Sequence, residues 1–536
     1  MHRGWLDSNI DIEVLDTTLR DGAQSEGITF SVRDKIAVAE ALDELGVAWI
    51  EAGNPGSNPK DLEFFRIARS LCLHNSKICA FGSTRKKGIK AADDPQIRTL
   101  LDAGTEGVAI FGKSWDLHVN EVLRVDPEEN IAMIAETVAC LKAEGRTVMF
   151  DAEHFFDGYA SNPDYALAAV RAARDSGADR IVLCDTNGGA FPDAVAAGVK
   201  AVRQVLCGAE ALGIHAHNDS GLALANAITA VQEGCVHVQG TLVGFGERCG
   251  NTALAALIPN LELKLRLRCL PEGNLVRISR LVRKVAEIAN VPVNDDMPYV
   301  GAHAFSHKAG MHADGILKER RSFEHILPEA VGNERHFLMS EAGGRSAIAE
   351  RVRKINPSIT REHPVIASLA EKLKSLEAAG WSFEGADASF EILVRRELGM
   401  YKPLFSIEAY RVGSEHPAGE TIACSHAWVK VLVEGQHEIA AAEGEGPVNA
   451  LDGALRRALT RFFPDLAKVR LEDYKVRVIN GKDATAAQVR VLIESTDGRR
   501  SWNTVGVSAD IIDASRAALA DSIEYKLIGD REMHGE

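Results

Sequence analysis

The strand-like stretch "IEVLDTT" at residues 12–18, followed by "VRDKIAVAEALDELG" at 32–46, sets a pattern that recurs through the first half of the chain. The first stretch is a short apolar run rich in strand-forming residues, and the second repeats apolar residues at helical spacing. Seven more apolar runs follow, each leading into a segment with helical periodicity; they lie at 48–54, 77–83, 107–112, 147–153, 180–186, 213–218 and 237–244. Glycines that favour left-handed C-caps close five of the helical segments, at Gly46, Gly104, Gly145, Gly177 and Gly234.

Eight strand–helix repeats before about residue 275 predict an α/β fold of the (β/α)₈ TIM-barrel type. An open, doubly wound parallel sheet is the alternative. The barrel is favoured because nearly every strand ends in a polar residue, and barrel active sites form at the C-terminal ends of the strands. Those ends are Asp21, Glu51, Ser83, Lys113, Glu153, Thr186, His217 and Gly244.

The sequence pattern changes twice after the predicted barrel. Helix-like segments around a polar, loop-rich piece occupy residues 276–400, and alternating strand-like and helix-like segments occupy 401–536. We therefore expect three parts: a catalytic barrel over 1–275, helical linker subdomains over 276–400, and a C-terminal α+β domain over 401–536.

Composition excludes several classes of protein. The formal net charge of −15 over 536 residues argues against nucleic-acid binding, which needs a basic face. No apolar run approaches the roughly 20 residues of a membrane span, and the N-terminus lacks an apolar signal segment. The nine cysteines form no CxxC pair, which is typical of reduced thiols. We expect a cytoplasmic protein without a membrane or nucleic-acid partner.

A metal site is predicted where three of these segments meet. In "GIHAHN" (213–218), His215 and His217 are two residues apart, so a strand would point both to the same side, roughly 7 Å apart at Cα. Asp21 follows the first strand, and Asn251 follows the eighth strand within "GFGERCGN" (244–251). Two imidazoles, a carboxylate and an amide suit one divalent ion (Mg²⁺, Mn²⁺, Co²⁺ or Zn²⁺) and leave positions for two substrate oxygens. Arg20, beside Asp21, would then face the carbonyl of a chelated oxo acid.

The segments "TTLRDG", "HAHND" and "GERCGN" resemble those of the metal-dependent Claisen and aldol family that includes 2-isopropylmalate, homocitrate and citramalate synthases, and also hydroxymethylglutaryl-CoA lyase. The resemblance extends to "GMHADG" (310–315) and to two segments of the synthases' regulatory domain, "EGEGPVNALDGAL" and "NTVGVSADIIDAS". The segment "DGAQSEGITFSVRDK" (21–35) is most similar to a branch of citramalate synthases, whereas most 2-isopropylmalate synthases carry a "DGEQ…PG" pattern.

The resemblance implies an acyltransferase of the EC 2.3.3 class that condenses acetyl-CoA with pyruvate, in isoleucine biosynthesis. It implies that Arg20 stabilises the growing alkoxide, that Thr186 anchors the substrate carboxylate, and that Glu153 orients the acetyl group or relays a proton. His312 would deprotonate the acetyl-CoA methyl group of a partner subunit's site. We also expect His118 to contact the substrate.

Several alternatives stay open. 2-Isopropylmalate synthase, using 2-oxoisovalerate, and homocitrate synthase are the nearest; Phe81, Phe111 and Asp151 are candidates for setting substrate size. A lyase would end near the barrel, and a non-catalytic amino-acid sensor would not need the intact set of metal ligands.

Some relatives have a tyrosine in the linker, but the matching stretch here, "AVGNERHFL" (330–338), has none. The C-terminal domain is expected to form a homodimer and to bind isoleucine as feedback inhibitor.

Overall fold

The computed structural model describes residues 11–206, 212–307, 310–337, 345–383, 385–415, 424–479, 487–498 and 500–534. The described chain divides into two compact units, one extending to Phe305 and including Ile326–Arg335, and the other containing Ser306–His325 and everything from His336 onward. Among the described residues, no helix combines the length and the apolar character needed to cross a membrane.

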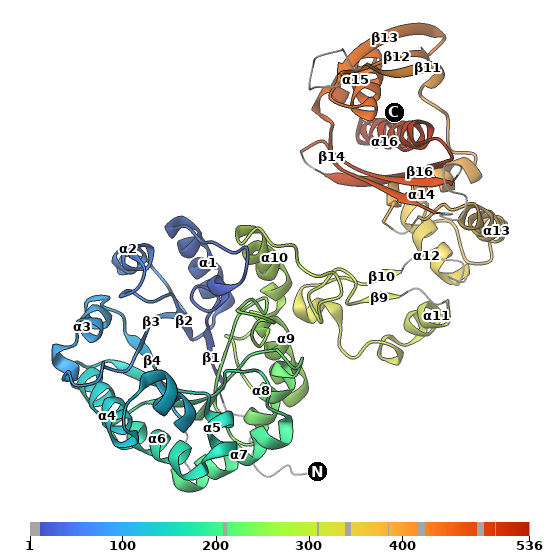
Figure 1. Ribbon diagram of the computed structural model, residues 1–536. Coiled ribbons are helices and arrows are strands. Elements are labelled where there is room, and N and C mark those ends of the chain that lie inside the picture. Colours follow the sequence, from blue (N-terminus) through green and yellow to red (C-terminus); the bar gives the residue numbers. More distant parts are fainter. Residues whose placement is uncertain are drawn as a thin grey trace. The chain divides into compact units, whose positions relative to one another are not determined.

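The first unit is a closed barrel of eight parallel strands, so the predicted TIM barrel is confirmed (Figure 1). Each strand pairs with the next one along the chain, and β1 pairs with β8 to close the ring. The strands are β1 (Glu13–Asp16), β2 (Trp49–Glu51), β3 (Lys77–Ser83), β4 (Gly107–Lys113), β5 (Thr147–Glu153), β6 (Arg180–Asp185), β7 (Leu212–Ala216) and β8 (His237–Gly240).

Helices cover the outside of the barrel (Figure 1). All five glycines predicted to close helical segments have positive φ, which is the left-handed conformation expected of C-caps. The helices are α1 (Val32–Leu45), α2 (Pro59–Ala68), α3 (Pro95–Asp102), α4 (Pro127–Ala143), α5 (Phe155–Ser161), α6 (Pro163–Asp175), α7 (Pro192–Val205), α8 (Ala223–Gln232), α9 (Leu254–Pro259) and α10 (Ile278–Ile288).

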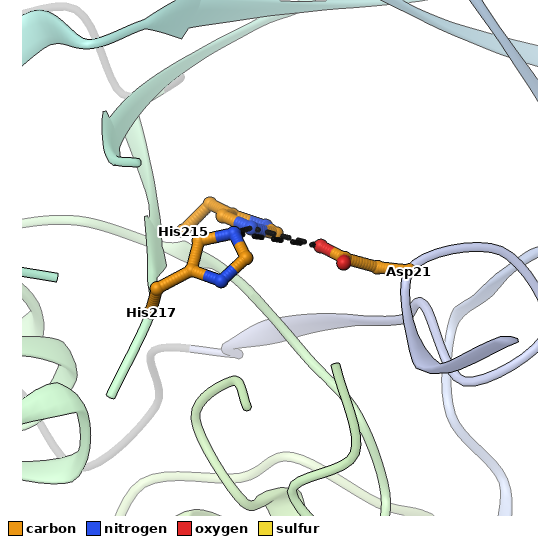
Figure 2. Close-up of side chains that lie close together, drawn as sticks. All are labelled: Asp21, His215 and His217. Atoms are coloured by element: carbon orange, nitrogen blue, oxygen red, sulfur yellow. Dashed lines mark hydrogen bonds and ion pairs between the residues drawn. The ribbon is translucent and has the colours of Figure 1, made fainter. Parts of the chain in front are cut away.

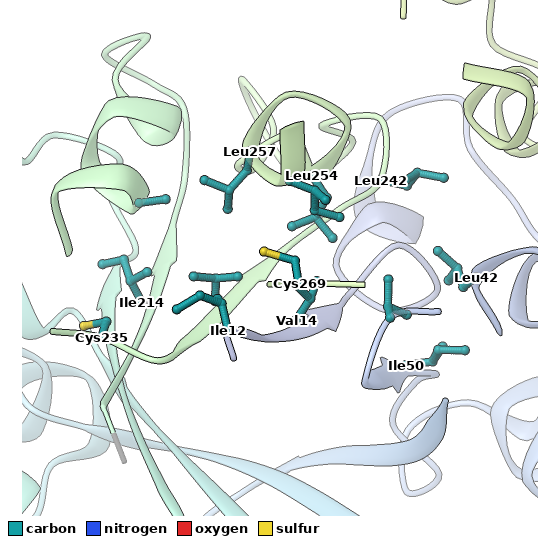
Figure 3. Packing of buried hydrophobic residues seen from close by; sticks show 14 of the residues in the cluster. Ile12, Val14, Leu42, Ile50, Ile214, Cys235, Leu242, Leu254, Leu257 and Cys269 are labelled. Carbon is teal, nitrogen blue, oxygen red and sulfur yellow. The ribbon is translucent and has the colours of Figure 1, made fainter. Parts of the chain in front are cut away.

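The alternation of side chains along each strand gives the barrel two separate packing regions. Outward residues such as Val14, Ile50 and Ile214 pack in one large core with Leu254 and Leu257 of α9 (Figure 3). A smaller apolar cluster is formed by strand residues of alternate parity: Leu15, Trp49, Cys79, Ala109 and Met149. Because successive strand side chains point to opposite faces, this second cluster fills the interior of the barrel.

The chain that follows the eighth strand–helix repeat packs with the barrel as far as Phe305. Helix α10 and the segment to Phe305 bury Leu281, Val285 and Val300 in the same core as the barrel. The compact unit therefore continues past residue 275, and the expected division at residues 275 and 400 stays a proposal.

The second unit begins with strand β9 (Ser306–His307), which pairs in parallel with β10 (His336–Phe337). Between β9 and β10 lies α11 (Gly310–Lys318), and three more helices follow: α12 (Arg345–Ile355), α13 (Pro364–Ala378) and α14 (Asp387–Glu397). The C-terminal α+β region repeats one motif, three antiparallel strands followed by a helix. The elements are β11 (Ser406–Glu415), β12 (Cys424–Val433), β13 (Gln436–Gly444), α15 (Pro447–Thr460), β14 (Arg470–Val478), β15 (Val489–Thr496), β16 (Ser501–Ser508) and α16 (Ile511–His534).

A buried ion pair holds the loop that follows β2. Lys35 of α1 and Asp61 of α2 pair with side chains only 6% and 9% exposed. The Lys35 ammonium also donates to the carbonyl of Ala52 at 2.7 Å, and Asp61 accepts from the backbone N–H of Asn54 at 2.9 Å. The pair thereby fixes the backbone next to Glu51, which contacts the site described below.

We predict that Asp61→Ala lowers the free energy of unfolding of the barrel by about 3–5 kcal/mol, because it leaves the Lys35 charge buried without a counter-ion. The control is Glu106→Ala, which breaks the exposed Lys77–Glu106 pair and should cost less than about 1 kcal/mol. Urea unfolding followed by tryptophan fluorescence measures both changes. Equal midpoint shifts for the two variants would contradict the prediction.

Candidate metal centre

Three buried side chains meet at the C-terminal mouth of the barrel: Asp21, His215 and His217 (Figure 2). The carboxylate oxygen Oδ2 of Asp21 lies 3.3 Å from Nε2 of His215 and 3.7 Å from Nε2 of His217. The two Nε2 atoms are 3.3 Å apart. Three ligand atoms this close around one point form a group that could hold a metal ion.

Strand pairing explains why residues so distant in sequence meet here. His215 lies within β7, and His217 continues the strand as a single bridge to Asn251. On the other side, the backbone of Thr17 after β1 donates to the carbonyl of Gly240 at the end of β8. The turn that carries Asp21 is therefore fastened to β8, next to β7.

Asn251, the fourth predicted ligand, is held so that its amide oxygen is free to bind. Its backbone N–H donates to the carbonyl of Gly244, and its Nδ2 donates to the carbonyl of Phe245 at 3.1 Å. Its Oδ1 is buried and makes no hydrogen bond among the described residues. A buried acceptor without a donor is costly, and a divalent cation would satisfy it. The four predicted ligands thus fit a metal ion.

Arg20 is fixed between two carboxylates. Its Nε donates to Glu51 at 2.5 Å, its Nη1 lies 3.5 Å from Oδ2 of Asp21, and its guanidinium stacks over the ring of Phe81. Burial lowers the pKa of Arg20, but Glu51 and Asp21 outweigh that effect and the net pKa is raised. Arg20 is therefore a permanent cation directed into the barrel mouth.

Asp21 and His217 have the protonation states that metal binding needs, whereas the pKa of His215 is raised. Burial alone would lower the pKa of His215, but its hydrogen bond to Asp21 and the Asp21 charge outweigh burial. Burial alone would raise the pKa of Asp21, but Arg20 and His215 hold it well below its usual range, so the carboxylate is ionised. Burial, together with the nearby His215, lowers the pKa of His217 to about 4. At neutral pH the His217 imidazole is therefore neutral, which is the form that ligates a metal.

A cavity of about 240 Å³ adjoins the cluster and is large enough for a small organic acid. Cationic, anionic and aromatic side chains line its walls. The lining residues are Arg20, Asp21, Gln24, Phe81, Phe111, Asp151, Glu153, Cys184, Thr186, His215, His217, Glu247 and Arg248. Two of the predicted substrate-handling residues, Glu153 and Thr186, are among them.

Glu153 and Thr186 already contact protein groups, and these contacts limit how each can interact with a ligand. Glu153 is ion-paired with Lys113 of β4. The Thr186 hydroxyl accepts from the backbone N–H of His154 at 2.9 Å, so its own hydrogen is available to a ligand. The Thr186 carbonyl accepts from Arg248, which also pairs with Asp219.

The remaining two predicted site residues are His118 and His312. His118 does not line the described cavity; its ring packs 4.1 Å from that of His154 and stacks on Trp115. His312 lies on α11 in the second compact unit, exposed and stacked on Phe323 at 4.2 Å. The roles assigned to both from sequence remain predictions.

Sequence reasoning missed Gln239. This residue of β8 contacts Nδ1 of His215 and the carboxylate of Asp151. The alternation of His237 and Gln239 in "HVQG" was the available signal, since it places two polar side chains on one face of a strand.

A closed (β/α)₈ barrel with a carboxylate, two imidazoles and an arginine at its C-terminal mouth defines a class of metal-binding barrel enzymes. Residues 11–283 match the HMGL-like family model, and the chain belongs to this family. Residues 299–380 match the homocitrate synthase post-HMGL domain, and residues 384–527 match the LeuA allosteric (dimerisation) domain.

Comparison with full-length relatives shows to which enzymes of this family the chain is most similar. An (R)-citramalate synthase of Aquifex aeolicus is 49% identical over 97% of this chain and 98% of its own length. One from Geobacter sulfurreducens is 47% identical over 98% of this chain and 99% of its own. A 2-isopropylmalate synthase of Pyrococcus furiosus is more distant, at 32% identity over 96% and 98%. Within the family, the chain belongs with the (R)-citramalate synthases.

We predict that Gly250→Ala weakens Mn²⁺ binding by about tenfold, because displacement of the loop that carries Asn251 removes one ligand of the site. Gly250 has φ +85°, and an added Cβ would lie 2.1 Å from the carbonyl oxygen of Gly244. Gly145→Ala is the matched control, since it also has positive φ (+74°) but its Cβ would meet nothing within 4 Å. Isothermal titration calorimetry on the EDTA-treated protein compares them, and equal affinities would contradict this assignment of the loop.

Proposed function

We propose that this chain condenses acetyl-CoA with pyruvate to give (R)-citramalate and CoA. The observation that carries the proposal is the Asp21–His215–His217 cluster with Arg20 directed beside it, in a chain that belongs with the (R)-citramalate synthases. The cavity next to the cluster matches a small 2-oxo acid in size and in its distribution of charge.

Asp21, His215, His217 and Asn251 are the residues that would hold one divalent ion, which we propose to be Mg²⁺, Mn²⁺, Co²⁺ or Zn²⁺. When bound, such an ion would act as a Lewis acid on the carboxylate and keto oxygens of pyruvate.

Arg20 would stabilise the negative charge that develops on the keto oxygen. Glu51 occupies its Nε, so the terminal nitrogens are the groups left to face the substrate. A cation already fixed before the reaction needs no reorganisation as the alkoxide forms, which is the main source of this kind of stabilisation.

The remaining cavity residues would position the two substrates. The Thr186 hydroxyl, with its own acceptor role already filled by His154, would donate to the pyruvate carboxylate. Glu153, held by Lys113, would orient the acetyl group or relay a proton. His118, whose ring packs 4.1 Å from that of His154, would contact the substrate.

We propose His312, supplied by a partner subunit, as the base. It would remove a proton from the acetyl-CoA methyl group, whose carbon then forms a bond to the keto carbon of pyruvate. Water afterwards cleaves the thioester C–S bond, so that the acyl carbon becomes a carboxylate and CoA leaves as the thiol. This hydrolysis makes the condensation irreversible.

We predict that pyruvate is turned over faster than 2-oxoisovalerate or 2-oxoglutarate. The stacked rings of Phe81 and Phe111, with centroids 5.4 Å apart, occupy the cavity wall where a larger substituent would lie. Release of CoA, measured by thiol titration over a panel of 2-oxo acids, tests this. Faster turnover of the branched acid would instead support 2-isopropylmalate synthase, and faster turnover of 2-oxoglutarate would support homocitrate synthase.

We predict that His312→Ala lowers kcat by about 10²–10⁴-fold while leaving Mn²⁺ affinity unchanged, since it removes a base but no ligand. Asp21→Asn should lose both activity and Mn²⁺ affinity. Steady-state kinetics and calorimetry on the same preparations separate the two effects. Full activity in His312→Ala would exclude the base, and full activity in Asp21→Asn would exclude the metal mechanism.

The C-terminal region supports a further part of the proposal, that the chain is a homodimer inhibited by isoleucine. The support is the match of residues 384–527 to the LeuA allosteric (dimerisation) domain, together with the repeated three-strand and helix motif. An end-product bound there would regulate the enzyme without resembling either substrate.

We predict that L-isoleucine reduces the rate of CoA release by the full-length chain and that L-leucine at the same concentration has a much smaller effect. Initial rates across an isoleucine titration, with analytical ultracentrifugation for the oligomeric state, provide the measurement. Equal responses to the two amino acids, or none, would contradict isoleucine as the regulator.

A further inference from the structure

Gln239 lies inside the barrel, 1% exposed, and contacts three polar side chains. Its Oε1 is 3.0 Å from Nδ1 of His215. Its Nε2 is 3.0 Å from Oδ1 of Asp151 and 3.5 Å from Nε2 of His237. Strand pairing supports these contacts, because Gln239 is in register with His215 on β7 and with Leu15 on β1.

The neighbours of Gln239 determine which way its amide points. Nδ1 of His237 faces the carboxylate of Glu13 at 3.3 Å, and a carboxylate accepts, so His237 donates through Nδ1. Nε2 of His237, the other ring nitrogen, lies 3.5 Å from Nε2 of Gln239. The carboxylate of Asp151 accepts a hydrogen bond from the same amide nitrogen. The amide nitrogen therefore faces Asp151 and His237, and the amide oxygen faces His215.

We propose that Gln239 is a positioning residue that fixes the tautomer and the ring orientation of His215 for metal binding. This inference rests on the proposed metal site. With Oε1 of Gln239 as acceptor, Nδ1 of His215 carries a hydrogen. Nε2 of His215, which faces Asp21 and His217, is then the nitrogen that a bound ion would take, in place of the hydrogen that it shares with the Asp21 carboxylate at 3.3 Å.

The orienting hydrogen bonds continue to the opposite end of the barrel. Glu13 begins β1, Arg180 begins β6 and His237 begins β8, so all three lie at the N-terminal ends of their strands. Arg180 donates to Glu13 at 2.6 Å. Burial raises the pKa of Glu13, but His237 and Arg180 outweigh it and bring the pKa to about 2. The series of contacts from Glu13 through His237 and Gln239 to His215 therefore begins at an ionised carboxylate.

The other imidazole of the cluster has no comparable support. Nδ1 of His217 is buried and makes no hydrogen bond in the part of the chain that the structure describes. Of the two histidines, His215 is therefore the one that the protein orients before a ligand binds, through Gln239. Side chains that hold a metal-binding histidine in this way typically change metal affinity by about 10- to 100-fold when removed.

The test is Mn²⁺ binding to the EDTA-treated full-length chain, measured by calorimetry for the native protein and three variants. Gln239→Met has a similar shape without the acceptor and should bind Mn²⁺ at least about tenfold more weakly. Gln239→Glu keeps an oxygen facing Nδ1 of His215, shares a proton with Asp151, and should stay within about threefold of native affinity. Met149→Leu, elsewhere in the barrel interior, is the control for packing and should bind as the native chain does.

The outcomes separate this role from the proposed metal site. If the native chain binds no Mn²⁺, both are wrong. If the native chain binds and Gln239→Met binds equally well, only the role of Gln239 is wrong. Weakening as large in Gln239→Glu or Met149→Leu as in Gln239→Met would also overturn it, because the acceptor would then not be the cause. Should Gln239→Met fail to fold, native-like binding by Gln239→Glu supports the role and a tenfold loss contradicts it.

Discussion

Closure of the barrel between β1 and β8 is the constraint on which the site depends. Asp21 belongs to the first strand–helix unit, whereas His215, His217 and Asn251 belong to the last two. Pairing of β1 with β8 brings Asp21 to the two histidines at the barrel mouth, and a bridge joins the backbone of Asn251 to that of His217. Without the pairing of β1 with β8, Asp21 would not be held beside the strands that carry the two histidines.

The interior of the barrel contains an apolar cluster and, beside it, polar side chains that orient the residues of the site. One cluster of inward residues, including Leu15, Trp49 and Met149, is apolar and supplies packing. Beside it, Gln239 links His215 to Asp151 and to His237, and Glu51 holds Arg20. Buried polar groups of this kind are stabilising when their hydrogen bonds are satisfied. Among the described residues, the buried Oδ1 of Asn251 has no hydrogen-bond partner, and a cation would supply one.

The sequence predicted the barrel and the metal-binding cluster because both follow from short periodicities. Strand runs, glycine C-caps and polar strand ends are local patterns, and barrel closure then brings Asp21 to the two histidines. Gln239 could not be assigned in this way, because its role depends on which side chains face it across the barrel. The packing of α10 against the barrel core could not be predicted from sequence for a related reason: α10 has the same amphipathic pattern whether it packs on the barrel or on a separate domain. His118 does not line the described cavity, and His312 belongs to the second unit, so the roles of both stay predictions.

The most direct test of the central claim is anomalous X-ray diffraction from crystals of the full-length protein grown with Mn²⁺ and pyruvate. We expect a single manganese peak bound by Asp21, by Nε2 of both histidines and by Oδ1 of Asn251, with two pyruvate oxygens completing the coordination and Arg20 facing the keto oxygen. A manganese peak elsewhere, or pyruvate bound away from this cluster, would show that these residues do not form the metal site.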